Sequence, residues 1–115
     1  MRMRNWRKDR YRDVVTIQED RSHDGEEQEN WKLFGADIHC KVIDINGMSS
    51  YRGVQLEETV STVVEMHYLE GLKPDMRIQY TDRSGKRTLN IKSVIVKRSG
   101  SAREKHWVFC DEVVV

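Results

Sequence analysis

Two histidines and two cysteines supply the ligand types of a zinc site. Cys40 follows His39 directly, and Cys110 stands four residues after His106. Imidazole and thiolate are the groups that structural zinc prefers. Neighbouring residues of a strand point to opposite faces, however, so His39 and Cys40 cannot easily hold one ion. We therefore predict no metal site and interpret both cysteines as small apolar core residues with reduced thiols, because a disulfide framework usually needs more cysteines.

The sequence contains no motif for catalysis. A glycine-rich phosphate loop, a nucleophile elbow and a metal-binding helix are all missing from the 115 residues. The glycines at positions 47, 53, 71 and 85 each fit a turn, and the carboxylates are scattered through loops, so no acid and base pair can be nominated. We predict a protein that is not an enzyme and that has no catalytic residue and no cofactor.

Basic residues gather at the start of the sequence. The first thirteen residues hold six basic and two acidic side chains, a net charge of +4, which leaves −3 for the remainder of a chain whose total is +1. Basic groups interleaved with aromatic rings suit contact with nucleic acid, and they suit docking on an acidic protein surface as well. A solvated terminus is the third interpretation. The candidate docking residues are Arg2, Arg4, Trp6, Arg7, Lys8 and Arg10.

A long loop over residues 46–59 is the second candidate site. Asn46-Gly47 is a turn signal, and the residues that follow are too rich in glycine and serine for a strand interior. The loop's net charge is −1, too little positive charge to clamp a phosphate backbone. Such a loop would let DNA slide past, although an ordinary solvated loop would have the same charge. Its candidate residues are Gly47, Met48, Ser49, Ser50, Tyr51, Arg52 and Gly53.

Strands must position both features. A two-fold alternation of apolar and polar residues predicts strands, and it is longest from Val60 to Tyr68. Ser84-Gly85 predicts a hairpin, and Val54 with Leu56 could begin one short helical turn. Trp31 and Trp107 are expected in the core. The other predicted strands are Val14–Gln18, Trp31–Ile45, Met76–Tyr80, Leu89–Val96 and His106–Val115, with a polar loop over Glu19–Glu29.

These elements predict an all-β fold. Six or seven short strands with no sustained helical period favour a small antiparallel β-barrel or sandwich with a long projecting loop and at most one short helix. We expect residues 1–13 to form the basic arm and residues 14–115 to form a single barrel domain. No run of apolar residues reaches the ~20 that a membrane-spanning helix needs, so no membrane contact is expected. Because the core is so small, we expect neighbouring subunits to contribute to its stability.

Five stretches carry a resemblance when they are taken in order. The most specific is Val64–Ile78, a strand followed by a turn and a Pro-Asp-Met-Arg segment. The others are Arg12–Gln18, Trp31 after a polar loop, Cys40–Gly47 and Leu89–Val94. In this order they resemble the bacteriophage head–tail joining family, also called head-closure or stopper proteins. The resemblance covers about Arg12 to Glu112. His67 stands where that family usually has arginine, and the basic arm is longer than is typical.

The resemblance implies a structural virion protein of a tailed bacteriophage. Family members form a homo-oligomeric ring, twelvefold in the family, at the head–tail connector, between the portal or adaptor protein and the tail-completion or tail-terminator protein. The ring joins head to tail, and packaged DNA passes through its channel. In some members the loop that matches residues 46–59 closes this channel, so the loop is the candidate gate. The location implied is the virion, and the host cytoplasm before assembly.

A free-standing β-barrel that binds nucleic acid or a peptide is the alternative. It would use the arm and an open barrel face. Such a face should be basic, whereas the sequence outside the arm carries −3.

Overall fold

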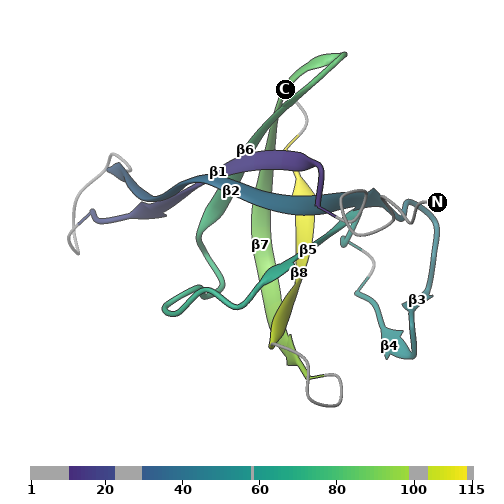
Figure 1. Cartoon of the computed structure of the whole chain (residues 1–115). Coiled ribbons are helices and arrows are strands. Elements are labelled where there is room, and N and C mark those ends of the chain that lie inside the picture. Colours follow the sequence, from purple (N-terminus) through teal and green to yellow (C-terminus); the bar gives the residue numbers. More distant parts are fainter. Residues whose placement is uncertain (1–10, 23–29, 58, 99–103, 114–115) are drawn as a thin grey trace, which may run out of the picture.

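The computed structural model describes residues 11–22, 30–57, 59–98 and 104–113, and all regular structure in these ranges is β. Eight strands follow one another along the chain, without a helix in the described ranges (Figure 1). They are β1 (Asp13–Asp20), β2 (Trp31–Asp44), β3 (Ser50–Tyr51), β4 (Val54–Gln55), β5 (Thr62–His67), β6 (Arg77–Asp82), β7 (Gly85–Lys97) and β8 (Lys105–Glu112).

Six of these strands close into an antiparallel barrel. The order around it is β1-β2-β5-β8-β7-β6, and β1 returns to β6 through the pairs from Val15↔Tyr80 to Gln18↔Arg77. The remaining strands, β3 and β4, form a separate two-stranded sheet. The predicted all-β class and small antiparallel barrel are therefore confirmed. Closure removes most of the open strand edges that would otherwise pair with another chain.

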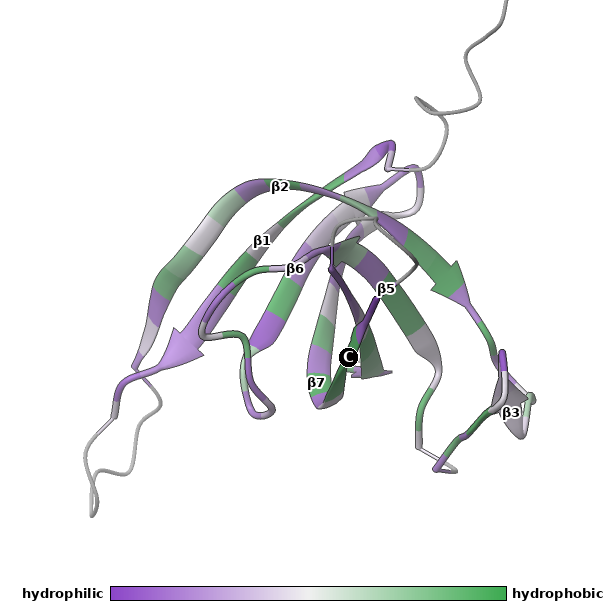
Figure 2. Cartoon of the chain, turned by 60° about the horizontal axis from the view of Figure 1, so that its bottom comes forward, coloured by the Kyte–Doolittle hydropathy of each residue, from purple (hydrophilic) through white to green (hydrophobic). Residues whose placement is uncertain are grey.

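The barrel interior is filled by alternate residues of all six strands. Figure 2 shows hydrophobic and hydrophilic residues alternating along the strands, as the two-fold pattern of the sequence predicts. Partly buried Phe34, Ile38, Leu69 and Leu72 pack against this core. The buried interior residues are Val15, Ile17, Cys40, Val64, Met66, Met76, Ile78, Leu89, Ile91, Val108 and Cys110.

A second apolar cluster lies on the outside of β5 and β8. All residues of β5 from Thr62 to Met66 are buried, so both faces of this strand are covered. Trp107 and Phe109 face this outer cluster, while Val108 and Cys110 face the interior. The outer cluster consists of Ile45, Tyr51, Val60, Val63, Trp107 and Phe109.

One local prediction was wrong. The segment after Met48 was expected to lack strands, but β3 and β4 pair there as a hairpin. The short helical turn that Val54 and Leu56 could have begun is not formed, because Val54 lies in β4. The hairpin reverses at Arg52 and Gly53, whose φ angles are 47° and 88°. A two-residue turn with positive φ at both positions matches the twist of paired strands. Arginine is uncommon in that conformation, so the sequence signal for the turn was weak.

Trp31 was expected in the core but is only partly buried. It pairs with Asp20 at the far end of β1 and β2, beyond the last pairs of β1 with β6 and of β2 with β5. The two strands continue there as a ribbon that leaves the barrel (Figure 1). The guanidinium of Arg77 lies 4.1 Å from the centre of the Trp31 ring, which covers one face of the indole with a cation.

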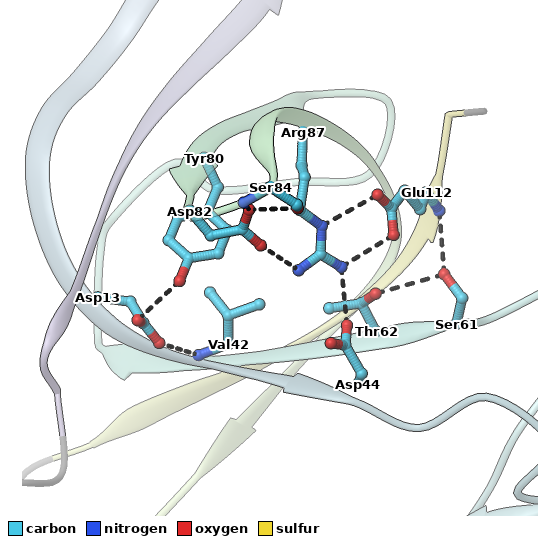
Figure 3. Close-up of polar contacts among 10 residues, drawn as sticks. All are labelled: Asp13, Val42, Asp44, Ser61, Thr62, Tyr80, Asp82, Ser84, Arg87 and Glu112. Carbon is cyan, nitrogen blue, oxygen red and sulfur yellow. Dashed lines mark hydrogen bonds and ion pairs between the residues drawn. The ribbon is translucent and has the colours of Figure 1, made fainter. Parts of the chain in front are cut away.

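The side chain of Arg87 forms hydrogen bonds to residues at the ends of several strands (Figure 3). Its guanidinium donates two hydrogen bonds to Glu112, at 3.0 and 2.8 Å, and others to Asp82 and Asp44. The Arg87 side chain is 14% exposed. The bond to Glu112 is the main cause that raises the pKa of Arg87 above its ordinary value. One cation therefore joins β2, the β6–β7 hairpin and the end of β8.

Replacing Arg87 should destabilise the barrel. In Arg87→Met three carboxylates lose their shared cation, so we expect the free energy of unfolding to fall by about 2 kcal/mol. Urea denaturation followed by tryptophan fluorescence measures this. Arg83→Met, on an exposed residue of the same hairpin, is the matched control and should change little. Equal midpoints for the two variants would contradict the assigned role.

Candidate functional site

Tyr51 fixes the candidate channel loop to the outside of the barrel. Its side chain is buried, and its hydroxyl donates a 2.5 Å hydrogen bond to Oε2 of Glu65 on β5. The ring makes edge-to-face contacts with Trp107 and Phe109, at centroid distances of 5.5 and 6.4 Å. The loop is therefore attached to the apolar wall that β5 and β8 present.

Glu65 is a buried carboxylate beneath this attachment. The residue is 7% exposed, and Nη1 of Arg52 lies 3.6 Å from its Oε2. The Arg52 guanidinium also lies 5.4 Å from the centre of the Tyr51 ring. Burial raises the pKa of Tyr51 to about 12, with the bond to Glu65 as a further cause. The phenol consequently remains a hydrogen-bond donor at neutral pH.

The other candidate residues of the loop are exposed. Met48 is 51% exposed, and its neighbours Ser49 and Ser50 are exposed as well. Gly47 has a φ of 82° in the turn that Met48 closes with a backbone bond to Ile45. The loop thus has a buried base at Tyr51 and an exposed tip, which we define as residues 47–50.

Beside Tyr51 lies a small basic pocket. Its volume is about 200 Å³, and Glu65 lies in one row with Lys41 and Trp107 across β2, β5 and β8. The pocket is lined by Tyr11, Lys41, Arg52, Glu65 and Lys105, which give it three cations and one buried carboxylate. Groups of this kind can hold an anion but offer no nucleophile with a neighbouring base.

Sequence reasoning did not single out Lys41, Glu65 and Lys105. Each occupies an ordinary polar position in a strand, and they come together only because the register places Lys41 opposite Glu65 and Lys105 opposite His67. One signal was present, because Glu65 is the one acidic residue between Val60 and His67. An acid in a strand that is otherwise so apolar indicates a buried polar partner.

The remaining candidate residues lie partly outside the described residues and partly in strands. The docking candidates Arg2, Arg4, Trp6, Arg7, Lys8 and Arg10 lie outside the described residues. His39 is exposed and Cys40 buried, so they point to opposite faces as predicted. Within the described ranges no three His, Cys, Asp or Glu side chains are grouped so as to hold a metal ion. In these same ranges no helix is long and apolar enough to cross a membrane.

Both cysteines are free and buried. Burial raises the pKa of the Cys40 thiol to about 12 and also raises the pKa of the Cys110 thiol. Neither sulfur is therefore present as the reactive thiolate at neutral pH.

Comparison with known proteins shows which family the chain belongs to. The model of the family described as phage head completion protein matches residues 7–113. The chain belongs to this family. The predicted resemblance to head-closure proteins is thereby confirmed. The family is one of structural virion proteins rather than enzymes, so this head completion protein is a structural component of the phage head and acts in the virion.

A solved structure shares the fold. The solution structure of protein SF1141 from Shigella flexneri 2a is similar with a TM-score of 0.60 and 23% sequence identity, over 90% of this chain and 93% of that one. No curated protein matches the chain significantly.

The bond between Tyr51 and Glu65 should be visible in the pH dependence of stability. Because the pKa of Tyr51 is raised, the folded protein holds this proton more tightly than the unfolded chain does. Its contribution is complete below about pH 10 and is lost as the pH rises through about 12. We expect Tyr51→Phe to lower the free energy of unfolding by about 1–2 kcal/mol at pH 7, because the carboxylate loses its donor, and to flatten the decline above pH 10.

Urea denaturation between pH 7 and pH 11.5 measures both effects. Tyr80, whose pKa burial and a bond to Asp13 also raise to about 12, keeps its share of the decline in both proteins. Tyr68→Phe, at an exposed tyrosine, is the control and should follow the wild type. A Tyr51→Phe curve parallel to the wild-type curve would exclude the assigned bond.

Proposed function

We propose that this head completion protein forms a ring at the head–tail connector, where it joins head to tail and closes the DNA exit channel. Family membership over residues 7–113 places the protein in the phage head. The observation that supports the gate is the division of the loop into a buried base at Tyr51 and the exposed tip. A tip on a fixed base can reach into a channel while the barrel stays rigid.

The composition of the loop is consistent with DNA passing without being bound. Residues 46–59 carry one arginine and two glutamates, and the arginine is already within 3.6 Å of Glu65. A surface that binds DNA needs several cations facing the phosphates, and it weakens steeply as salt rises. The mechanism is therefore steric: the tip blocks or clears the channel, and the barrel wall holds its base.

The proposed partners are the proteins on either side of the ring in the head–tail connector. The ring, twelvefold as the resemblance implies, lies between the portal or adaptor protein on the head side and the tail-completion or tail-terminator protein on the other. Before assembly the subunits are in the host cytoplasm. The basic arm, residues 1–13, docks on an acidic neighbour, and residues 14–115 form the ring body.

DNA-filled heads that lack this protein provide the test. Added wild-type protein should bind them in a saturable way, protect their DNA from nuclease and allow tails to attach. Heads that remain nuclease-sensitive and tailless would contradict the proposal. If the protein then shifts free DNA in a gel, and the shift weakens steeply as salt rises, the result supports the alternative of a free-standing barrel that binds nucleic acid.

The tip can be tested without disturbing the base. Deleting residues 48–52 would remove Tyr51 and uncover the wall, so we choose the double variant Met48→Gly and Ser49→Gly. We expect an unchanged melting temperature, normal head binding and several-fold faster loss of DNA from completed heads. A variant that retains DNA as the wild type does would show that the tip is not the gate.

The arm is tested by charge reversal. Replacing Arg4, Arg7, Lys8 and Arg10 by glutamate should weaken binding to heads by at least about tenfold, because four favourable charge pairs become repulsive. Circular dichroism should show the same melting temperature. If this variant completes heads normally, the arm is not part of the docking surface.

A further inference from the structure

Two oppositely charged cavities lie on different sides of the barrel. The basic pocket is on the outside of β2, β5 and β8. A second cavity of about 490 Å³ lies between the end of β1 and the segment just before β6. In the strand order, β5 in the middle of the first cavity is three positions from β6 beside the second in a ring of six, so the two cavities lie on different sides of the barrel.

The basic pocket has two lysines without an acidic partner. Neither Lys41 nor Lys105 forms an ion pair with another described residue, whereas Arg52 is directed to Glu65. Tyr11 lines the pocket too, with its ring 5.8 Å from Nζ of Lys105. The lining residues carry a net charge of +2 on a body whose sequence charge is −3. Two ammonium groups that have no carboxylate partner among the described residues favour a further anionic partner.

The second cavity has the opposite sign. Glu19, Asp20 and Asp75 line it with Lys73, a net charge of −2. Arg21 already donates a 2.6 Å hydrogen bond to Oε1 of Glu19, so a partner would meet the other carboxylate oxygen of Glu19. Asp20 is held rigidly, because its Oδ1 accepts backbone hydrogen bonds from Ser22 and Asn30 at 2.9 and 3.0 Å. Those bonds lower the pKa of Asp20 below its ordinary value, so it is ionised at neutral pH. Asp75 is exposed, at a φ of 76°.

We propose that the basic pocket of one copy binds the acidic cavity rim of the next copy, with Lys41 and Lys105 facing Glu19 and Asp75. This inference rests on the proposed ring. A contact between two different faces of the same chain repeats from copy to copy, and it closes into a ring when the rotation allows. Complementary cavities on different sides of the barrel are what such a contact needs.

A second copy fits the pocket better than DNA does. A cavity of about 200 Å³ admits a side chain, whereas a phosphate backbone runs past such a recess. The buried carboxylate of Glu65 beside the bound Arg52 also disfavours the dense charge of a nucleic acid. Exposed ion pairs contribute little affinity each but strongly select orientation and partner. The contact therefore sets the direction of the ring and should weaken with salt.

Charge swapping tests the contact. One variant reverses the pocket, with Lys41→Glu and Lys105→Glu, and the other reverses the rim, with Glu19→Lys and Asp75→Asn, which leaves Asp20 in its hydrogen bonds. Each variant alone brings like charges together, so the number of subunits bound per DNA-filled head should fall at least several-fold. An equimolar mixture can alternate the two variants with every contact complementary, and it should restore the wild-type number. Lys86→Glu with Lys92→Glu, at exposed residues of β7, is the charge-matched control and should bind normally.

The outcomes separate the inference from the proposed function. If the wild type binds heads and either variant alone binds normally, the proposed contact is wrong. The contact is also wrong if the mixture of variants does not restore binding. In both cases the proposed head closure remains supported. If the wild type does not bind heads, the proposed function fails. In that case the contact is tested by sedimentation velocity, which measures self-association of the concentrated protein in low salt. Association by wild type and by the mixture, but by neither variant alone, supports it, and any other pattern overturns it.

Discussion

The outer faces of β5 and β8 carry apolar side chains that a closed barrel alone would leave in water. Val63, Trp107 and Phe109 are buried there because the loop between β2 and β5 folds back over them. The hydrogen bond from Tyr51 to Glu65 holds the loop in place and gives a buried carboxylate its donor. This one contact between loop and wall determines which residues of the loop are buried and which are free to meet a partner.

The same contact explains how much the sequence could predict. Alternation along β5 and β8 identified both strands, and turn signals such as Ser84-Gly85 located hairpins. What alternation could not indicate was that the polar-looking face of β5 is buried too. That depends on Tyr51, which lies 14 residues before Glu65 in the chain and reaches it only in the folded structure.

The basic pocket was hidden for a related reason. Lys41 and Lys105 are 64 positions apart in numbering, and only the strand register brings them to one side of the barrel. Trp31 was misplaced because periodicity cannot tell a strand inside a barrel from one that continues beyond it as a ribbon. The family resemblance, in contrast, depended on the order of short stretches along the chain, and that order is read directly from the sequence.

In the proposed function, the barrel wall holds the loop at Tyr51, and the exposed tip of the loop faces the DNA channel. Electron cryomicroscopy of DNA-filled heads completed with this protein tests that claim most directly. We expect a closed ring of barrels at the portal vertex, with Tyr51 still packed against Trp107 and the loop tip facing the central axis. Copies scattered away from the axis, or a ring whose loop tips face outward into solvent, would contradict it.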